Sequence, residues 1–242
     1  MITLKLDDRD LQIGLSGLSG QKVKWAAKDA LDLTAADVLA HVRGRVDAVF
    51  DRPTSFTRNA FGMRKAHTER LEATVFERPR QANRDYLKVQ EAGGLRPRTG
   101  LEELLNSRLA YDGLITAAVP APFATLDAYG NWSKGERNQA LSAVQAQRDA
   151  TANTTRASRR RNRKRAGFFV PGKDSRLPAG IWKRDPDGVI YQVLRFTRVV
   201  PQYQKRLGFY EGADEVFEMR LPIHLRQQIE ARIARAAARG QG

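Results

Sequence analysis

Residues 21–50, QKVKWAAKDALDLTAADVLAHVRGRVDAVF, decide the fold of this 242-residue chain. Their apolar side chains return at steps of three and four, the spacing that places them on one face of an α-helix. The helix is expected to begin after the Ser19-Gly20 pair and to end before Pro53, because a proline ring disfavours the helical conformation at the preceding residue. One long face of this helix must therefore be buried. Its apolar residues are Val23, Ala27, Ala30, Leu31, Val38, Val42, Val46, Val49 and Phe50.

Two short segments after this helix alternate apolar and polar residues, as strands with one buried face do. The first, residues 71–77 (LEATVFE), stops before Pro79 and is predicted to be a half-exposed strand. The second, residues 86–91 (YLKVQE), stops at Gly93-Gly94. Together they predict a small antiparallel sheet next to the long helix.

The C-terminal part of the chain predicts a β-hairpin and then helix. Residues 180–184 (GIWKR) and 189–196 (VIYQVLRF) are strand-like. In the intervening Asp185-Pro186-Asp187-Gly188, proline fixes one backbone angle and glycine accepts a positive one, which is typical of a tight turn. From residue 214 to 238, apolar residues return at helical spacing with one break at Pro222, so one or two helices are expected.

The middle of the chain is interrupted by prolines and glycines. Residues 94–129 predict loops with at most one strand. Ser133 stands three residues before Glu136, a capping-box spacing that predicts the start of a polar helix. The fold class is therefore α+β: a long N-terminal helix packed on a small antiparallel sheet, a β-hairpin in the C-terminal half and a C-terminal helix.

Three regions are expected from these elements. Residues 1–93 form a helix-plus-sheet region, and residues 94–167 form an insertion with the polar helix and an exposed basic segment. Residues 168–242 hold the hairpin and the C-terminal helix, and they are expected to fold as one domain with residues 1–93.

The run from Arg156 to Arg165, RASRRRNRKR, is the densest charge in the chain, with seven Arg or Lys among ten residues. It contributes to a net charge of +15 and a pI near 10.5, which predicts attraction to nucleic acid or to an acidic protein surface. A solvated basic loop without a partner is the alternative. The residues expected to contact nucleic acid or an acidic partner are Arg156, Arg159, Arg160, Arg161, Arg163, Lys164 and Arg165.

The sequence holds no constellation that predicts catalysis. It has no cysteine, which excludes disulfides, thiolate metal sites and cysteine nucleophiles. His41, His67 and His224 lie far apart, and His67-Thr68-Glu69 resembles a zinc-deaminase H-x-E that lacks the necessary cysteines. Pro186-Asp187 is not followed by the acidic-x-Lys of a nuclease. No enzymatic activity, cofactor, metal or small-molecule substrate is therefore expected.

No stretch of the sequence approaches the roughly 20 consecutive apolar residues of a membrane span. The N-terminal MITLKLDDRD is acidic where a signal peptide is basic and then apolar. No membrane partner is expected.

The order of five segments resembles the minor tail protein Z, or tail-completion (head–tail junction), family of tailed bacteriophages. They are the helix at 21–50, residues 52–61 (RPTSFTRNAF), the strand at 71–77, residues 126–132 (LDAYGNW) and residues 177–182 (LPAGIW). The resemblance covers most of the chain and rests on segment order rather than on a catalytic signature. It implies a virion structural protein of the neck or tail, present in the host cytoplasm during assembly, without enzymatic activity or cofactor.

The resemblance also implies the partners. They are portal, adaptor or tail proteins, with viral DNA as a further partner, and a homo-oligomer that closes as a ring of about six or twelve copies. Aromatic residues are enriched at such contacts. The expected interface anchors are Tyr203, Phe209, Tyr210 and Phe217, and the alternative for half or more of them is a place in the core.

Two other classes of function stay open. The chain could be a free cytoplasmic nucleic-acid-binding protein that uses the same basic run. A nuclease or another hydrolase is the third class, which the missing catalytic residues disfavour.

Overall fold

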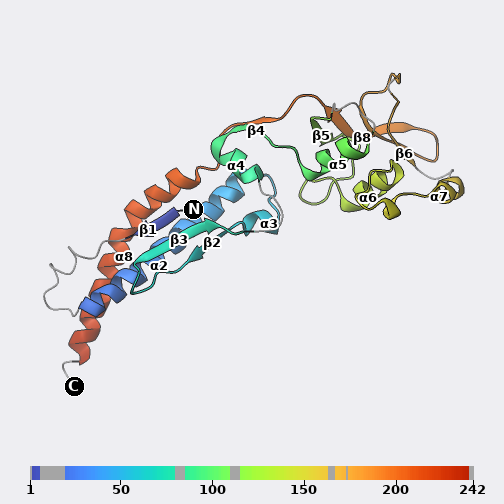
Figure 1. Cartoon of the computed structure of the whole chain (residues 1–242). Helices are drawn as coiled ribbons and strands as arrows, with labels where there is room; N and C mark the ends of the chain where they lie inside the picture. Colours follow the sequence, from blue (N-terminus) through green and yellow to red (C-terminus); the bar gives the residue numbers. More distant parts are fainter. Residues whose placement is uncertain are drawn as a thin grey trace. The chain divides into compact units, whose positions relative to one another are not determined.

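The computed structural model describes residues 2–5, 20–79, 85–109, 115–162, 167–172 and 174–239. It confirms the α+β class, with the N-terminal helix α2 (Gly20–Val49), antiparallel sheets and the C-terminal helix α8 (Phe209–Arg239; Figure 1). The chain divides into two compact units: unit 1 is Met1–Arg84 with Lys205–Gly242, and unit 2 is Asp85–Gln204. This division differs from the expected one, because the hairpin belongs to the middle unit and not with the C-terminal helix.

Unit 1 contains a three-stranded antiparallel sheet in the order β1-β3-β2. The central strand, β3 (Glu72–Glu77), pairs with β1 (Ile2–Lys5) on one side and with β2 (Phe61–Arg64) on the other. A short helix, α3 (Ser55–Arg58), precedes β2 and is capped by Thr54, whose side chain accepts from the Thr57 backbone. The strand predicted over residues 71–77 is therefore confirmed.

Helix α2 is the central element of unit 1, since one of its sides packs on β2 and β3 and another packs on α8. Figure 1 shows α8, in orange and red, running along α2, in blue. The two helices are antiparallel, because Asp37 of α2 pairs with Arg220 early in α8, whereas Asp29 pairs with Arg232 near its end. The helix begins at Gly20, one residue earlier than predicted, and it ends before Pro53, as predicted. Its buried residues are Val23, Ala26, Ala27, Ala30, Leu31, Thr34, Ala35, Val38, Leu39, Val42 and Val46.

Helix α8 continues through Pro222, so the C-terminal segment is one helix and not two. Proline has no N–H, and the helix therefore lacks one backbone hydrogen bond, to the carbonyl of Glu218. Pro222 lies on the exposed side of α8, where water can bond to that carbonyl. This explains why a residue that usually ends a helix is tolerated here.

In unit 1, Asp37 of α2 forms hydrogen bonds with two side chains of α8, Arg220 and His224. Its Oδ2 accepts from Arg220 Nε at 2.6 Å and lies 2.8 Å from His224 Nε2. Burial opposes the charged form of this carboxyl, but the hydrogen bonds with His224 and Arg220 outweigh it and keep the pKa of Asp37 below its ordinary value of 3.8. Its contribution to stability is therefore present above pH 3.8 and is lost as the pH falls through the lowered pKa.

Replacing Asp37 by asparagine is expected to lower the free energy of unfolding of unit 1 by about 1–3 kcal/mol. The change leaves Arg220 without its carboxylate and gives the buried His224 a weaker acceptor. Urea unfolding with hydrogen-exchange mass spectrometry measures the loss in peptides of unit 1. Asp47→Asn is the matched control, because the Asp47–Arg58 pair on the same helix is largely exposed and contributes at most about 1 kcal/mol. Equal losses in the two variants would contradict the role of Asp37.

Unit 2 is built on a four-stranded antiparallel sheet in the order β5-β8-β7-β6. The predicted hairpin is its centre and is formed by β7 (Gly180–Arg184) and β8 (Ile190–Thr197). β5 (Ala117–Pro120) and β6 (Gly167–Phe169) are the two edge strands. A separate pair of short strands joins β4 (Gly94–Leu95) to β9 (Gln202–Tyr203).

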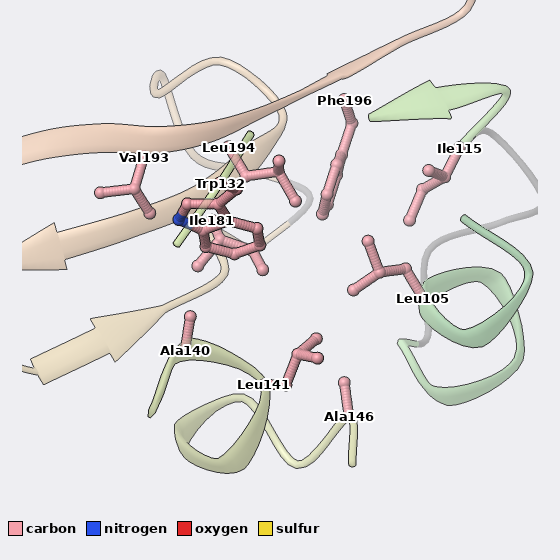
Figure 2. Packing of buried hydrophobic residues seen from close by; sticks show 10 residues of the cluster. All are labelled: Leu105, Ile115, Trp132, Ala140, Leu141, Ala146, Ile181, Val193, Leu194 and Phe196. Carbon is pink, nitrogen blue, oxygen red and sulfur yellow. The ribbon is translucent and has the colours of Figure 1, made fainter. Parts of the chain in front are cut away.

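The core of unit 2 lies between this sheet and two helices, α5 (Gly100–Arg108) and α6 (Lys134–Ala143). Figure 2 shows Leu105 of α5 and Leu141 of α6 in the same cluster as Leu194 of β8. The remaining members of the cluster are Ile115, Trp132, Ala140, Ala146, Ile181, Val193 and Phe196.

Two helices of unit 2 lie where the sequence predicted a strand or loops. Residues 86–91, expected to be a strand, belong to α4 (Asp85–Ala92). Six residues of alternation do not separate a strand from a helix, and Leu, Lys, Gln and Glu are strong helix formers. In the region 94–129, where at most one strand was expected, the structure has two, β4 and β5, and the helix α5 was missed.

Candidate functional site

The segment between α6 and the next helix, α7 (Arg156–Arg161), is tied to α6 by hydrogen bonds. Ser142 Oγ donates to the Ala152 carbonyl at 2.8 Å, within the 3₁₀ turn Ala150–Ala152. Gln145 Nε2 donates to the Thr154 carbonyl, also at 2.8 Å. None of residues 150–162 is buried, and small polar side chains, rather than apolar ones, attach the segment to the fold.

Helix α7 presents the first half of the basic run to solvent. It starts at the cap Thr155, whose Oγ1 accepts from the backbone N–H of Ser158 at 3.1 Å. Its four guanidinium groups are exposed, and none of them forms an ion pair with an acidic residue of the described part of the chain. They belong to Arg156, Arg159, Arg160 and Arg161. The other predicted contact residues, Arg163, Lys164 and Arg165, lie outside the described residues.

A groove lies beside α7, between α6 and the edge strand β6. Arg159 of α7 and Asn162, the C-cap of that helix, line it on one side, while Phe168 and Phe169 line it from β6. The surrounding unit 2 carries 20 Lys and Arg against 11 Asp and Glu, so the field around the groove is positive. The arrangement offers an anion several exposed guanidinium groups next to a concave surface.

The two buried glutamates of unit 2 are structural. Glu102 forms a salt bridge with Arg96, with Oε1 2.6 Å from Nη2. Glu136 Oε2 accepts from the backbone N–H of Thr125 at 2.6 Å and from Trp132 Nε1 at 2.9 Å. Because each carboxylate is already bonded within the fold, neither stands ready as a general acid or base.

The Asp37–His224 pair is the arrangement in the described chain that most resembles catalytic machinery, and the sequence did not reveal it. His224 is buried, and its Nδ1 has no hydrogen-bond partner within the described residues. In a catalytic triad, the second nitrogen of such a histidine would face a nucleophilic hydroxyl. No described side chain occupies that position, and the pair links α2 to α8.

The four aromatic residues predicted as interface anchors lie in different environments. Phe209 is buried and stacks on Phe61 with ring centroids 5.1 Å apart, so its assignment to an interface is corrected: it belongs to the core of unit 1. Tyr210 is exposed on α8, and Phe217 is partly buried there. Tyr203 is exposed in β9 of unit 2.

The weaker motifs of the sequence lie in exposed turns. His67 is exposed, and its backbone forms an isolated antiparallel β-bridge with that of Arg70. Asp187 lies in the hairpin turn, where its backbone N–H donates to Asp185 Oδ1 at 3.1 Å. Among the described residues, no three His, Asp or Glu side chains are placed to hold a metal ion. In that same part of the chain, no helix combines the length and apolar character needed to cross a membrane.

No family model, curated protein or solved structure matches the chain. The candidate site is therefore defined by the chemistry of its own residues.

Proposed function

We propose that this protein is a non-enzymatic structural component of the neck or tail of a bacteriophage, which joins portal-proximal and tail components and contacts DNA through α7. The observation that carries the DNA contact is the set of four exposed guanidinium groups on α7, none of which forms an ion pair within the described part of the chain. The virion role is supported by the order of sequence segments that resembles tail-completion proteins. A ring of about six or twelve copies, contacting portal, adaptor or tail proteins, belongs to the same proposal.

The physical basis of the contact is the release of counterions. A cation that neutralises a phosphate releases the counterions condensed around that phosphate. The logarithm of the binding constant therefore falls linearly with the logarithm of the salt concentration. Each contact to duplex DNA contributes about 0.9 to that slope. Since exposed arginines pay little for desolvation before binding, all four groups of α7 are available to phosphates.

Replacing Arg156, Arg159, Arg160 and Arg161 by glutamine is expected to reduce the salt slope of duplex-DNA binding by about 3 to 4. Glutamine keeps the helix propensity of the segment, so α7 is retained. Fluorescence anisotropy of labelled duplex DNA across a salt series measures the slope.

The matched control removes the same charge from exposed arginines elsewhere in unit 2. It is the glutamine variant of Arg98, Arg148, Arg176 and Arg198. We expect it to change the slope much less, and equal slopes would show that net charge rather than α7 is responsible. Tighter binding to polyglutamate than to DNA would replace the DNA contact by a contact with an acidic protein.

The structural role is tested in purified particles of the phage that encodes the chain. Quantitative mass spectrometry is expected to find the protein in every particle, in a fixed ratio to the portal protein. Absence from particles would leave the alternative of a free nucleic-acid-binding protein. Magnesium-dependent DNA cleavage by the pure chain would contradict the non-enzymatic assignment.

A further inference from the structure

Helix α8 carries a second apolar stripe on the side that faces away from the core of unit 1. Its inner side is buried at Ala213, Leu221 and His224. On the opposite side, Met219 is 61 % exposed, Ile223 45 % and Ile233 47 %. Large apolar side chains that gather on one exposed face mark a surface for association.

The spacing of this outer stripe is that of a coiled coil. Positions 219, 223, 226, 230, 233 and 237 follow one another at steps of four and three, which is the a/d pattern of a heptad repeat. All six residues are exposed. They are Met219, Ile223, Arg226, Glu230, Ile233 and Ala237, here called the outer seam.

The two charges at the centre of the outer seam are of opposite sign. Arg226 and Glu230 form no ion pair with any residue of the described part of the chain, and each has an isoleucine as its other neighbour on the seam, Ile223 or Ile233. We propose that two copies of this chain associate through the outer seam, with their α8 helices antiparallel and a two-fold axis at residue 228. The partner of this surface is therefore a second copy of the same protein.

In this pairing every layer of the seam is complementary. Ile223 packs against the partner's Ile233, and Met219 packs against the partner's Ala237. Arg226 faces the partner's Glu230, and the two-fold axis repeats that ion pair. Antiparallel coiled coils place an a position opposite a d position, which is the match that all three layers make.

The charges also select the orientation. In a parallel pair, Arg226 would face the partner's Arg226, and Glu230 would face the partner's Glu230. Both central layers would therefore be repulsive. In the antiparallel pair, both layers are attractive. Between residues 219 and 237 the seam spans about 27 Å of helix at about 1.5 Å per residue, which is short, and we expect micromolar rather than nanomolar affinity.

This contact is distinct from the proposed ring and does not rest on the virion role. An isologous contact closes as a pair, whereas a ring needs two different surfaces on each subunit. The proposal uses only the residues of α8 and their exposure.

Charge reversal in the full-length protein tests the pairing. Sedimentation velocity across a concentration series is expected to show reversible dimerisation of the unaltered chain. Arg226→Glu alone and Glu230→Arg alone are each expected to weaken it about tenfold or more, because both variants create two facing like-charge pairs. The double variant R226E/E230R restores opposite charges and is expected to return the dissociation constant to within about threefold.

Two further variants separate the seam from general effects on α8. Glu218→Arg changes an exposed charge outside the seam and is expected to leave dimerisation unchanged. Ile223→Ser removes an apolar contact and is expected to weaken it, while circular dichroism confirms that each variant keeps its helix content. A monomer at all concentrations, an assembly insensitive to the single reversals, or a double variant that fails to recover would each overturn the proposal.

Discussion

Replacing Glu102 by glutamine is expected to lower the free energy of unfolding of unit 2 by about 3–5 kcal/mol. Glu102 is only 1 % exposed, and each oxygen of its carboxylate accepts two hydrogen bonds. Oε1 accepts from Arg96 Nη2 at 2.6 Å and from the Ala118 backbone at 2.8 Å. Oε2 accepts from Arg96 Nη1 at 3.2 Å and from the Thr99 backbone at 2.6 Å. Glutamine removes the charge opposite Arg96 and turns one acceptor into a donor that faces other donors.

The position of Glu102 explains why the whole unit is affected. The side chain lies on α5, but its bonds reach Arg96 before that helix and Ala118 on β5. Losing the Glu102 carboxylate therefore removes the hydrogen bond that holds the edge strand β5 to the helix α5. Glu103→Gln is the control, since Glu103 is exposed on the same turn and its replacement is expected to cost less than about 0.5 kcal/mol. Urea unfolding followed by hydrogen exchange in peptides of residues 85–204 measures both variants, and similar losses would contradict the argument.

The same substitution predicts a pH dependence. Burial opposes the charged form of Glu102, but the hydrogen bonds from Arg96, Thr99 and Ala118 outweigh it and hold the pKa of Glu102 below its ordinary value of 4.5. The contribution of the Glu102 carboxylate to the stability of unit 2 is therefore complete above pH 4.5, and it is lost as the pH falls through the lowered pKa. The difference in stability between the unaltered chain and the Glu102→Gln variant should shrink on acidification, and a constant difference would show that the charge is not responsible.

Glu102 also shows where sequence reasoning stopped short. Ser133 and Glu136 were recognised as a helix start from their spacing, and α6 begins there. Thr99 and Glu102 have the same spacing and form a full capping box at the start of α5. The signal was present, but the prolines and glycines around it favoured loops. Local start signals deserve more weight than the composition of their surroundings.

Contacts between distant parts of the chain could not be predicted in this way. The long helix α2 and the β7–β8 hairpin follow from periodicity and turn chemistry, which are local. Asp37 and His224 are separated by 187 residues, and nothing near either residue marks the pair. The exposure of the arginines on α7 was expected from charge alone, whereas their attachment through Ser142 and Gln145 depends on a fold that charge does not encode.

Gly180→Ala is expected to destabilise unit 2 by about 3–5 kcal/mol, because glycine is required here for space as well as for backbone conformation. Gly180 begins β7 and has φ +157°. A Cβ at this position would overlap the carbonyl oxygen of Leu194, which is backbone of the neighbouring strand and cannot rotate away. It would also lie 2.5 Å from Gln192 Nε2, whose bond to the Ala179 carbonyl would be displaced. The two strands must separate to admit the methyl group.

Two other glycines of unit 2 separate the contributions to this loss. Gly188, in the hairpin turn, has φ +90° but open space around its Cβ position, so Gly188→Ala carries backbone strain alone and is expected to cost about 1–2 kcal/mol. Gly167 in β6 has neither a positive φ nor a close neighbour, and Gly167→Ala is expected to change stability by less than about 0.5 kcal/mol. Urea unfolding of the three variants should rank them in that order. If Gly180→Ala cost no more than Gly188→Ala, the close approach of β7 to Leu194 would not constrain this fold. The central hairpin would then accommodate a methyl group at residue 180 without separation of its strands.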